Sequence, residues 1–297
     1  MAGNVDISKL PDEYREIYEN YIMPVDTNIS MDSVILSQEN KDKYDLFIRE
    51  RQYRDEFYKY GLEPINRLLL YGASGTGKTY SSKALSNHLG LTMLYVDIAK
   101  ALSDETVANN ISDIFKLGNY LGDSLIMFDE CDAVAWQRDS GSSDTGTIRR
   151  ATNSLFQQLD QMNHSNVFIA ATNMLHRLDP AFERRFNLKL EFQRPKFNLK
   201  EAIVRFKHNE FIFIDDVDKT SETIVDRRAA NNTKLSYYEI QGLVERAMKD
   251  SILDGKREVR SSRIYNDLAN AMRIKFRFKT DEDPDGTFDS PEDNYNR

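Results

Sequence analysis

The run Gly72–Thr79, with the sequence GASGTGKT, restricts the fold more than any other part of the chain. It fills every fixed position of the pattern G-x-x-x-x-G-K-[ST]. The apolar run Arg67–Tyr71 precedes it, and a helical pattern begins at Tyr80. A strand, a glycine-rich loop and a helix start bring backbone N–H groups together on phosphate oxygens. The sequence therefore predicts a phosphate-binding loop in which Lys78 reaches the β- and γ-phosphates and the Thr79 hydroxyl is a ligand for Mg²⁺.

A second stretch, Ser124–Glu130, has the composition of a buried strand that ends in two adjacent carboxylates. In a doubly wound sheet the carboxyl ends of the strands face the crevice where ligands bind. We therefore expect Asp129 to hold Mg²⁺ through a water molecule and Glu130 to orient or deprotonate an attacking water. A strand end with two solvated acids is the alternative, and the upstream loop argues against it. The loop alone predicts nucleotide binding, and the Asp-Glu pair indicates hydrolysis.

Three further polar residues lie near the ends of the last two predicted strands: Asn173 after one strand, and Arg184 and Arg185 before the other. Asn173 closes the stretch Ala170–Asn173 and should emerge at the same edge as Asp129, where its amide could hold the attacking water or contact the γ-phosphate. An asparagine after a strand is otherwise usually a turn residue. Arg184 and Arg185 precede the last predicted strand. Arginine suits the charge of a phosphoryl-transfer transition state, but a surface pair making local salt bridges fits this segment equally well.

Composition excludes several classes of protein. The chain has 297 residues, a formal net charge of -8 at pH 7, and one cysteine. The acidic balance argues against a nucleic-acid-binding surface, and one cysteine excludes an intrachain disulfide and fits a reducing compartment. No apolar run approaches the roughly 20 residues of a membrane-spanning helix, and no secretory signal is evident near Met1. We expect a cytoplasmic protein that does not contact membranes.

Strand-like runs alternate with helical patterns from Arg67 onward, which indicates an α/β fold with a five-stranded parallel P-loop sheet flanked by helices. The expected strands cover residues 67–71, 92–96, 125–129, 167–171 and 188–192. Helices are expected at 8–22, 39–60, 107–120 and 147–161, with a polar loop at 139–146. The first of these helices either packs on the core or docks a partner.

Composition changes at Pro195, and a small α-helical lid domain is expected beyond it, with helices near 198–208, 236–253 and 261–273 and a polar insert at 215–233. The tail from Thr280 is acidic with few apolar residues, which predicts disorder; docking of a basic partner is the alternative. The predicted domains are residues 1–31 for an N-terminal helical extension, 32–194 for the large domain, 195–278 for the lid and 279–297 for the acidic disordered tail.

The order of four motifs, GASGTGKT, LIMFDECDA, IAATN and LDPAFERRF, resembles the AAA family of ATPases, and within it the clade of FtsH-, katanin- and spastin-type modules. The resemblance covers about residues 32–275. It implies ATP and Mg²⁺ as cofactors and a head-to-tail ring of identical subunits, most often a hexamer, with ATP between neighbours. The corresponding nucleotide-binding residues are Gly72, Ala73, Ser74, Gly75, Thr76, Gly77, Lys78, Thr79 and Tyr80, with Val34 and Ile35 at the adenine.

The resemblance also implies catalytic roles. Lys78, Glu130 and Asn173 would act on the ATP of their own subunit, with Thr79 and Asp129 at the metal. Arg184 and Arg185 would act as arginine fingers on the neighbour's ATP, although the family usually separates the two arginines by a short insertion with glycine. The stretch Ser236–Ile240 resembles the start of the lid helix that replaces a sensor 2 arginine, but it carries two tyrosines where Gly-Ala is common.

Besides the adjacent arginines and the two tyrosines, a third departure from the family's sequence pattern bears on function. The family's first pore loop carries an aromatic-aliphatic pair that grips extended polypeptide, and the matching stretch Ala101–Thr106 is shorter and has no aromatic residue. One hypothesis is a ring ATPase that remodels a protein client. The other is a nucleotide-gated regulatory subunit that controls a separately encoded effector, such as a protease or nuclease of a bacterial defence or toxin–antitoxin pair. A clamp-loader or replication-initiator ATPase on DNA fits the acidic chain less well.

Overall fold

The computed structural model describes residues 5–103, 106–135, 145–194, 206, 210–214, 236–268 and 270. The chain divides into two compact units, Met1–Gln193 and Arg194–Arg297, which we treat separately. Several sequence expectations lie outside the described residues: most of the loop at 139–146, the insert at 215–233, nearly all of the helix at 198–208, and the acidic tail. The lid, tail and domain limits therefore remain predictions.

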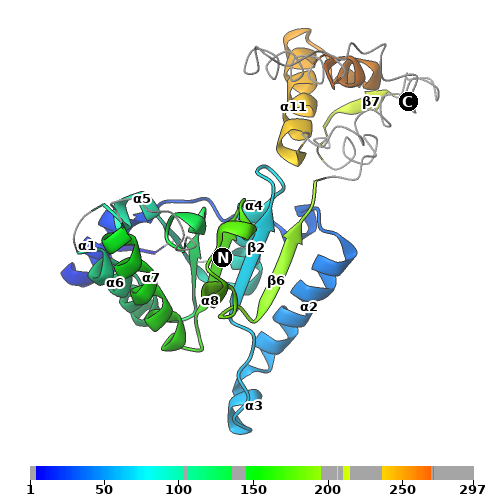
Figure 1. Ribbon diagram of the computed structural model, residues 1–297. Helices are drawn as coiled ribbons and strands as arrows, with labels where there is room; N and C mark the ends of the chain where they lie inside the picture. Colours follow the sequence, from blue (N-terminus) through cyan, green and yellow to red (C-terminus); the bar gives the residue numbers. More distant parts are fainter. Residues whose placement is uncertain are drawn as a thin grey trace, which may run out of the picture. The chain divides into compact units, whose positions relative to one another are not determined.

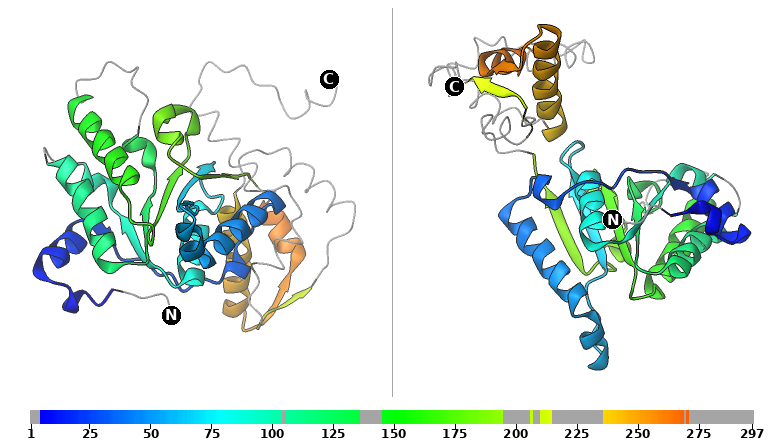
Figure 2. Two further views of the ribbon diagram at one scale, coloured as in Figure 1. Left: turned by 90° about the horizontal axis from the view of Figure 1, so that it is seen from below. Right: turned by 180° about the vertical axis from the view of Figure 1, so that it is seen from behind.

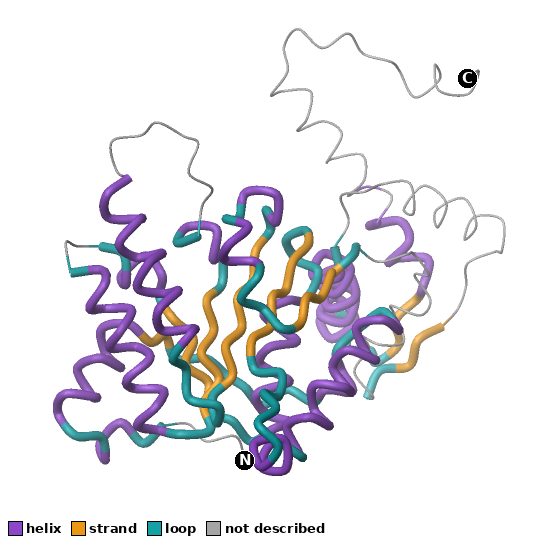
Figure 3. Tube along the Cα trace, turned by 60° about the horizontal axis from the view of Figure 1, so that its bottom comes forward, coloured by secondary structure: helices purple, strands orange, loops and turns teal. Residues whose placement is uncertain are grey.

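The first unit contains the predicted parallel sheet (Figures 1 and 3). Five parallel strands were expected and all five are present. A sixth strand, β1, pairs antiparallel with β3 at the edge of the sheet, Ile22 opposite Val96. The strand order is β1-β3-β4-β5-β2-β6, with β1(Ile22–Met23), β2(Arg67–Gly72), β3(Thr92–Val96), β4(Ser124–Phe128), β5(Val167–Thr172) and β6(Leu188–Phe192).

Alternating side chains give the sheet two apolar faces. One face, with Leu68, Leu125 and Val167, packs against α2(Gln38–Gln52) and α4(Lys78–Leu89). The opposite face packs against helices that include α1(Asp12–Tyr21), α6(Val107–Leu121) and α7(Thr145–Asp160). Because both faces are buried, the central strands are apolar throughout, as expected for a parallel sheet. The chain between α1 and α2 passes from one face to the other (Figure 2).

Two predicted helices have different limits in the structure. The helix expected at 8–22 begins only at Asp12, because Pro11 precedes it and the backbone of Leu10 is extended. Residues before Pro11 form a short 3-10 turn, and Ile22 belongs to β1. The helix expected at 39–60 is interrupted at Tyr53, which separates α2 from α3(Arg54–Lys59). The remaining helical elements of this unit are η1(Ile7–Lys9), η2(Met31–Ser33), α5(Ile98–Ala101), η3(Cys131–Ala133), η4(Leu175–Arg177) and α8(Pro180–Glu183).

The second unit has a small apolar core of its own. The helix α11(Tyr237–Leu253) begins with a capping box formed by Ser236 and Glu239, close to the start that the sequence predicts. Residues 261–268 are also helical. An all-helical unit was expected, but β7(Ile212–Ile214) pairs in parallel with β8(Glu258–Arg260). Val244, Val259 and Ile264 are buried together, so the helices and this small sheet share one core.

Among the described residues, no helix has both the length and the apolar character needed to cross a membrane.

Phe168 lies at the centre of the larger apolar cluster and is fully buried. Its ring lies 5.7 Å from that of Phe115, 5.3 Å from that of Phe128 and 6.0 Å from that of Phe186, between centroids. These contacts join β5 to β4, α6 and the turn after α8, so Phe168 connects the sheet to the helices of one face.

Phe168→Ala should lower the free energy of unfolding by about 3–5 kcal/mol, because it removes buried surface and leaves a cavity. Tyr60→Ala is the control, since that side chain is 73% exposed and exposed substitutions usually change stability by about 0.5 kcal/mol or less. Urea denaturation of the purified variants measures both values. Equal small effects would show that Phe168 does not hold the layers together.

Candidate functional site

The glycine-rich loop connects β2 to α4, and two of its glycines are required by the backbone. Gly72 has φ +138, and a Cβ atom there would lie 2.1 Å from the carbonyl oxygen of Phe192 on β6. Gly77 has φ +100 and forms the N-cap of α4. Side chains other than glycine rarely adopt these angles. Ser74 and Gly75 lie exposed at the loop tip, while Thr76 is buried and its hydroxyl donates to the carbonyl of Ala73 at 2.8 Å.

Lys78, the first residue of α4, turns its ammonium group back into the loop. Nζ donates to the carbonyls of Gly72 at 2.8 Å and Ala73 at 2.9 Å, and to Oδ1 of Asn173 at 2.8 Å. The side chain is buried, and burial lowers its pKa although the nearby carboxylates of Asp129, Asp132 and Glu130 act in the opposite direction. The ammonium group is thus held by neutral oxygens at the place where phosphates are expected to bind.

Thr79, which follows Lys78 in the chain, and Asp129 place a hydroxyl and a carboxylate side by side. The Thr79 hydroxyl donates to Oδ2 of Asp129 at 2.5 Å. Hydroxyl and carboxylate oxygens are the ligands that Mg²⁺ accepts, and the ion usually completes its shell with waters and phosphate oxygens. The described residues contain no cluster of three or more His, Cys, Asp or Glu side chains suited to a metal. The hydroxyl and carboxylate of the Thr79–Asp129 pair fit a magnesium ion whose shell is completed by waters and the phosphates of a nucleotide.

Glu130 follows Asp129 in an unusual backbone conformation. Its φ is +54 and its ψ is +43, the left-handed region that side chains other than glycine seldom occupy. Its N–H donates to Oδ1 of Asp129 at 3.0 Å, and its side chain is exposed. Such conformations concentrate at functional sites, where the surrounding structure enforces them. Here the turn separates the two carboxylates: Asp129 faces α4 and Glu130 faces solvent.

Asn173 is placed by the residue before it. Thr172 is fully buried at the end of β5. Its hydroxyl donates to Oδ1 of Asp132 at 2.8 Å and accepts the N–H of Met174 at 2.9 Å. These bonds fix the turn in which Asn173 reaches Lys78. Asp132, in the 3-10 turn η3, thus supports the end of β5.

Tyr95 also belongs to this group, although it lies in neither of the sequence motifs. Its hydroxyl, on β3, donates to Oδ2 of Asp129 at 3.1 Å. Oδ2 therefore accepts from both Thr79 and Tyr95. The strand register brings it there, because parallel pairing places Tyr95 beside Met127, two residues before Asp129. The sequence alone does not give this register.

The residues expected at the adenine lie on a segment that packs along α4. Val34 is buried, and Ile35 is partly buried. The Ser33 hydroxyl lies 2.9 Å from the hydroxyl of Tyr80, which is on the first turn of α4. This bond connects the segment to the helix that follows the glycine-rich loop, so Val34, Ile35 and Tyr80 lie in one region of the unit.

The two arginines differ in their surroundings. Arg185 makes two hydrogen bonds of 3.1 Å to the carboxylate of Asp160 and lies with its guanidinium 4.0 Å from the ring centroid of Phe156. Arg184 is exposed, and its Nε donates to the carbonyl of Pro180 at 3.2 Å. None of these bonds reaches the glycine-rich loop. The structure thus does not bring the arginines to the site of their own chain.

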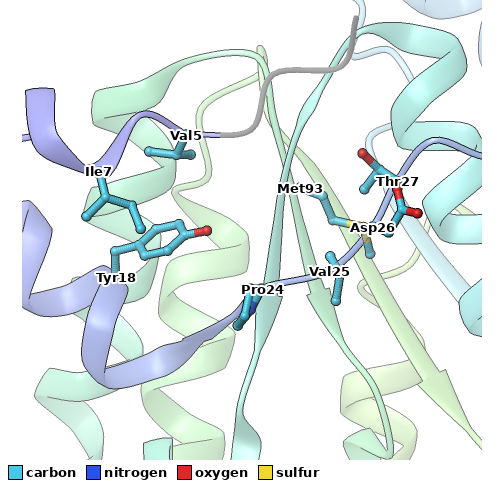
Figure 4. Close-up of a pocket in the computed structure, with 8 residues that line it drawn as sticks. All are labelled: Val5, Ile7, Tyr18, Pro24, Val25, Asp26, Thr27 and Met93. Carbon is cyan, nitrogen blue, oxygen red and sulfur yellow. The ribbon is translucent and has the colours of Figure 1, made fainter.

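A cavity of about 460 Å³ lies in another part of the same unit (Figure 4). Its walls include Tyr18 of α1, Met93 of β3 and residues 24–27 between α1 and η2. None of the residues that line it is among those expected to bind nucleotide, so the candidate site does not include this cavity.

Comparison with known proteins supports the expected chemistry. The family model described as "ATPase family associated with various cellular activities (AAA)" matches residues 68–194, which include the residues expected to act in catalysis. An uncharacterized AAA family ATPase of Sinorhizobium fredii is 27% identical over 88% of this chain and 76% of its own length. The 26S proteasome regulatory subunit 6A of Schizosaccharomyces pombe is 30% identical over 71% of this chain and 50% of its own.

A putative 26S proteasome regulatory subunit homolog of Methanothermobacter marburgensis is 33% identical over 66% of this chain and 51% of its own. The chain therefore spans about half the length of these two proteasome-related relatives. The matches do not single out the FtsH-, katanin- and spastin-type clade that the motifs suggest.

Lys78→Ala should abolish ATP binding, because it removes the ammonium group that is expected to bind the phosphate oxygens. Glu130→Gln should keep ATP binding and lose hydrolysis, because an amide cannot accept the proton of the attacking water. Isothermal titration calorimetry and a phosphate-release assay measure the two effects. Equal loss of ATP affinity in both variants would contradict this division of roles.

Proposed function

This chain belongs to the AAA family of ATPases, and we propose that it hydrolyses ATP with Mg²⁺ between the subunits of a ring and thereby remodels a protein partner. The convergence of Lys78, Thr79, Asp129 and Asn173 at one edge of the sheet is the observation that carries the proposal. Together these residues provide a buried cation, a hydroxyl and a carboxylate for Mg²⁺ and its waters, and an amide.

Each residue has a role that follows from its surroundings. Lys78 exchanges the carbonyls of Gly72 and Ala73 for phosphate oxygens, which are stronger acceptors for an ammonium group. Asn173, held by its turn, orients the γ-phosphate or the attacking water. Glu130 faces solvent and takes the proton of that water. Mg²⁺ bound at Thr79 and Asp129 would neutralise charge on the β- and γ-phosphates.

Arg184 is our candidate for the finger that acts on a neighbouring subunit. An arginine finger must be free to leave its own chain and bind a phosphate oxygen elsewhere. Arg185 is held by Asp160 and Phe156. Among the described residues, the side chain of Arg184 instead donates to a backbone carbonyl within its own helical turn. A contact in which each subunit's arginine serves the next subunit is head-to-tail, and it closes into a ring when the rotation permits. We expect six subunits and a cytoplasmic location.

The nature of the partner rests on the relatives and on one segment of the structure. Two relatives carry names of proteasome regulatory subunits, which favours a protein partner over nucleic acid. In the stretch matching the pore loop, Ala101 is buried and Leu102 packs against the core. The two apolar side chains of this stretch therefore turn inward. This observation favours the second candidate function, a nucleotide-gated subunit that controls a separate effector, over threading of a polypeptide.

Single substitutions should separate the two arginines. Arg184→Ala should lower the rate of ATP hydrolysis by about 10³-fold or more, because a finger supplied in trans is typically worth that much, and should leave the melting temperature unchanged. Arg185→Ala should lower the free energy of unfolding by about 1 kcal/mol, as expected for a partly exposed ion pair with a ring contact. Phosphate release and thermal denaturation report the two effects. A reversed pattern would assign the finger to Arg185.

Mixing variants tests whether the finger acts on a neighbour. Neither Arg184→Ala nor Lys78→Ala alone should hydrolyse ATP, but a mixture should regain part of the activity. Some interfaces of a mixed ring join an intact nucleotide loop to an intact Arg184. Native mass spectrometry monitors the mixed rings and their subunit number. Mixed rings without recovered activity would show that Arg184 does not act in trans.

The two candidate functions differ in what the Glu130→Gln variant retains. A client that is remodelled should stay bound to this variant with ATP and should be absent from Lys78→Ala. An effector that is gated as a constant partner should copurify with both variants, with only its activity depending on the nucleotide. Affinity purification of both variants from the native host, followed by mass spectrometry, distinguishes the two functions.

A further inference from the structure

The hydroxyl of Tyr95 donates a hydrogen bond to Asp129, the carboxylate proposed to act at the magnesium ion. Tyr95 lies outside both Gly72–Thr79 and Ser124–Glu130, the two motifs of the nucleotide site. Its hydroxyl lies 3.1 Å from Oδ2 of Asp129. Within the part of the chain that the structure describes, the other donors to this carboxylate are the Thr79 hydroxyl, on α4, and the N–H of Glu130, in the turn after β4. Tyr95 differs from both because it belongs to β3. It is therefore the donor that fixes the carboxylate to the neighbouring strand of the sheet.

The strand register explains how Tyr95 reaches this position. Tyr95 pairs with Met127 in the parallel ladder between β3 and β4. Side chains two residues apart on a strand lie on the same face. Asp129 therefore lies on the same face of the sheet as Met127, the face covered by α4. A side chain as long as tyrosine can span the diagonal between neighbouring strands and meet the carboxylate beyond the last pair.

The surroundings of Tyr95 limit where its ring can lie. The ammonium group of Lys83 lies 6.0 Å from the ring centroid. Lys83 is one helical turn after Thr79 on α4, so the ring lies beside the face of α4 that carries Thr79. The aromatic ring is thus confined between the helix and the strand end.

We propose that Tyr95 is a positioning residue for magnesium, whose hydroxyl holds the carboxylate of Asp129 in the orientation that the metal shell requires. This inference rests on the proposed magnesium–ATP site. Groups that hydrogen-bond a metal-shell carboxylate set its orientation, and removing one of them typically costs 10–100-fold in metal affinity or activity. Tyr95 would act on the metal through Asp129, without touching the nucleotide.

The test measures how magnesium strengthens nucleotide binding, independently of turnover. A fluorescent ADP analogue is titrated into wild type and Tyr95→Phe, first in EDTA and then with increasing Mg²⁺. Tyr95→Phe keeps the ring and removes only the hydroxyl. We expect the Mg²⁺ concentration for half-maximal tightening to rise about ten-fold, and the affinity in EDTA to stay within two-fold of wild type.

Tyr44→Phe is the matched control. Tyr44 is a buried tyrosine whose hydroxyl lies 3.1 Å from that of Ser81 on α4, so this variant loses a hydroxyl contact to the same helix but none to Asp129. Its magnesium dependence should equal that of wild type even where its melting temperature falls. A shift of equal size in both variants would mean that Tyr95 matters only for the stability of the domain.

The outcomes also separate this inference from the proposed function. If wild type binds the analogue with no response to Mg²⁺, the magnesium–ATP site itself is wrong. If wild type responds and Tyr95→Phe has the same half-maximal concentration within two-fold, only the role of Tyr95 is wrong. An equal loss of affinity in EDTA and in Mg²⁺ would also overturn it, because a positioning role for the metal predicts a difference between the two conditions.

Discussion

The buried ammonium group of Lys78 is the interaction on which the site depends. A charged group removed from water is costly unless it is hydrogen-bonded or paired. Here three acceptors surround Nζ: the carbonyls of Gly72 and Ala73 and the amide oxygen of Asn173. These acceptors come from the end of β2, the loop itself and the end of β5, so the charge fixes the loop relative to two strands. The same buried position makes the group a strong partner for a phosphate, because little water competes for it.

The parallel register brings the remaining groups to Lys78, and much of this could be predicted from the sequence. β4 lies between β3 and β5, and β5 pairs with β2, so Asp129 and Asn173 end on adjacent strands near the loop. Asp129 and Asn173 could both be predicted from the sequence, because each is a polar residue at the end of an apolar strand. Tyr95 lies before its strand ends and was missed, because its role depends on which residue of β4 it pairs with. The sequence alternation places Met93 and Tyr95 on one face of β3 and Val96 on the other. Only the observed register shows that Tyr95 meets Asp129.

Other features could not be predicted because they depend on tertiary contacts or on short elements. The break at Tyr53 that divides the predicted helix into α2 and α3 has no glycine or proline nearby to signal it. The strands β1 and β7 have only two and three residues, too few to show a pattern. The difference between Arg184 and Arg185 depends on Asp160 and Phe156, which are distant in sequence. The late start of α1, by contrast, was signalled by Pro11. The spacing of residues in the sequence predicts which helix or strand a residue belongs to. Which partner a charged surface side chain has depends on how those helices and strands pack together.

The most direct measurement is a crystal structure of the Glu130→Gln variant with ATP and Mg²⁺. The account predicts that Nζ of Lys78 leaves the carbonyls of Gly72 and Ala73 for a phosphate oxygen, while Thr79 and Asp129 lie at the metal. Phosphates bound elsewhere, with Lys78 still held by those two carbonyls, would contradict it.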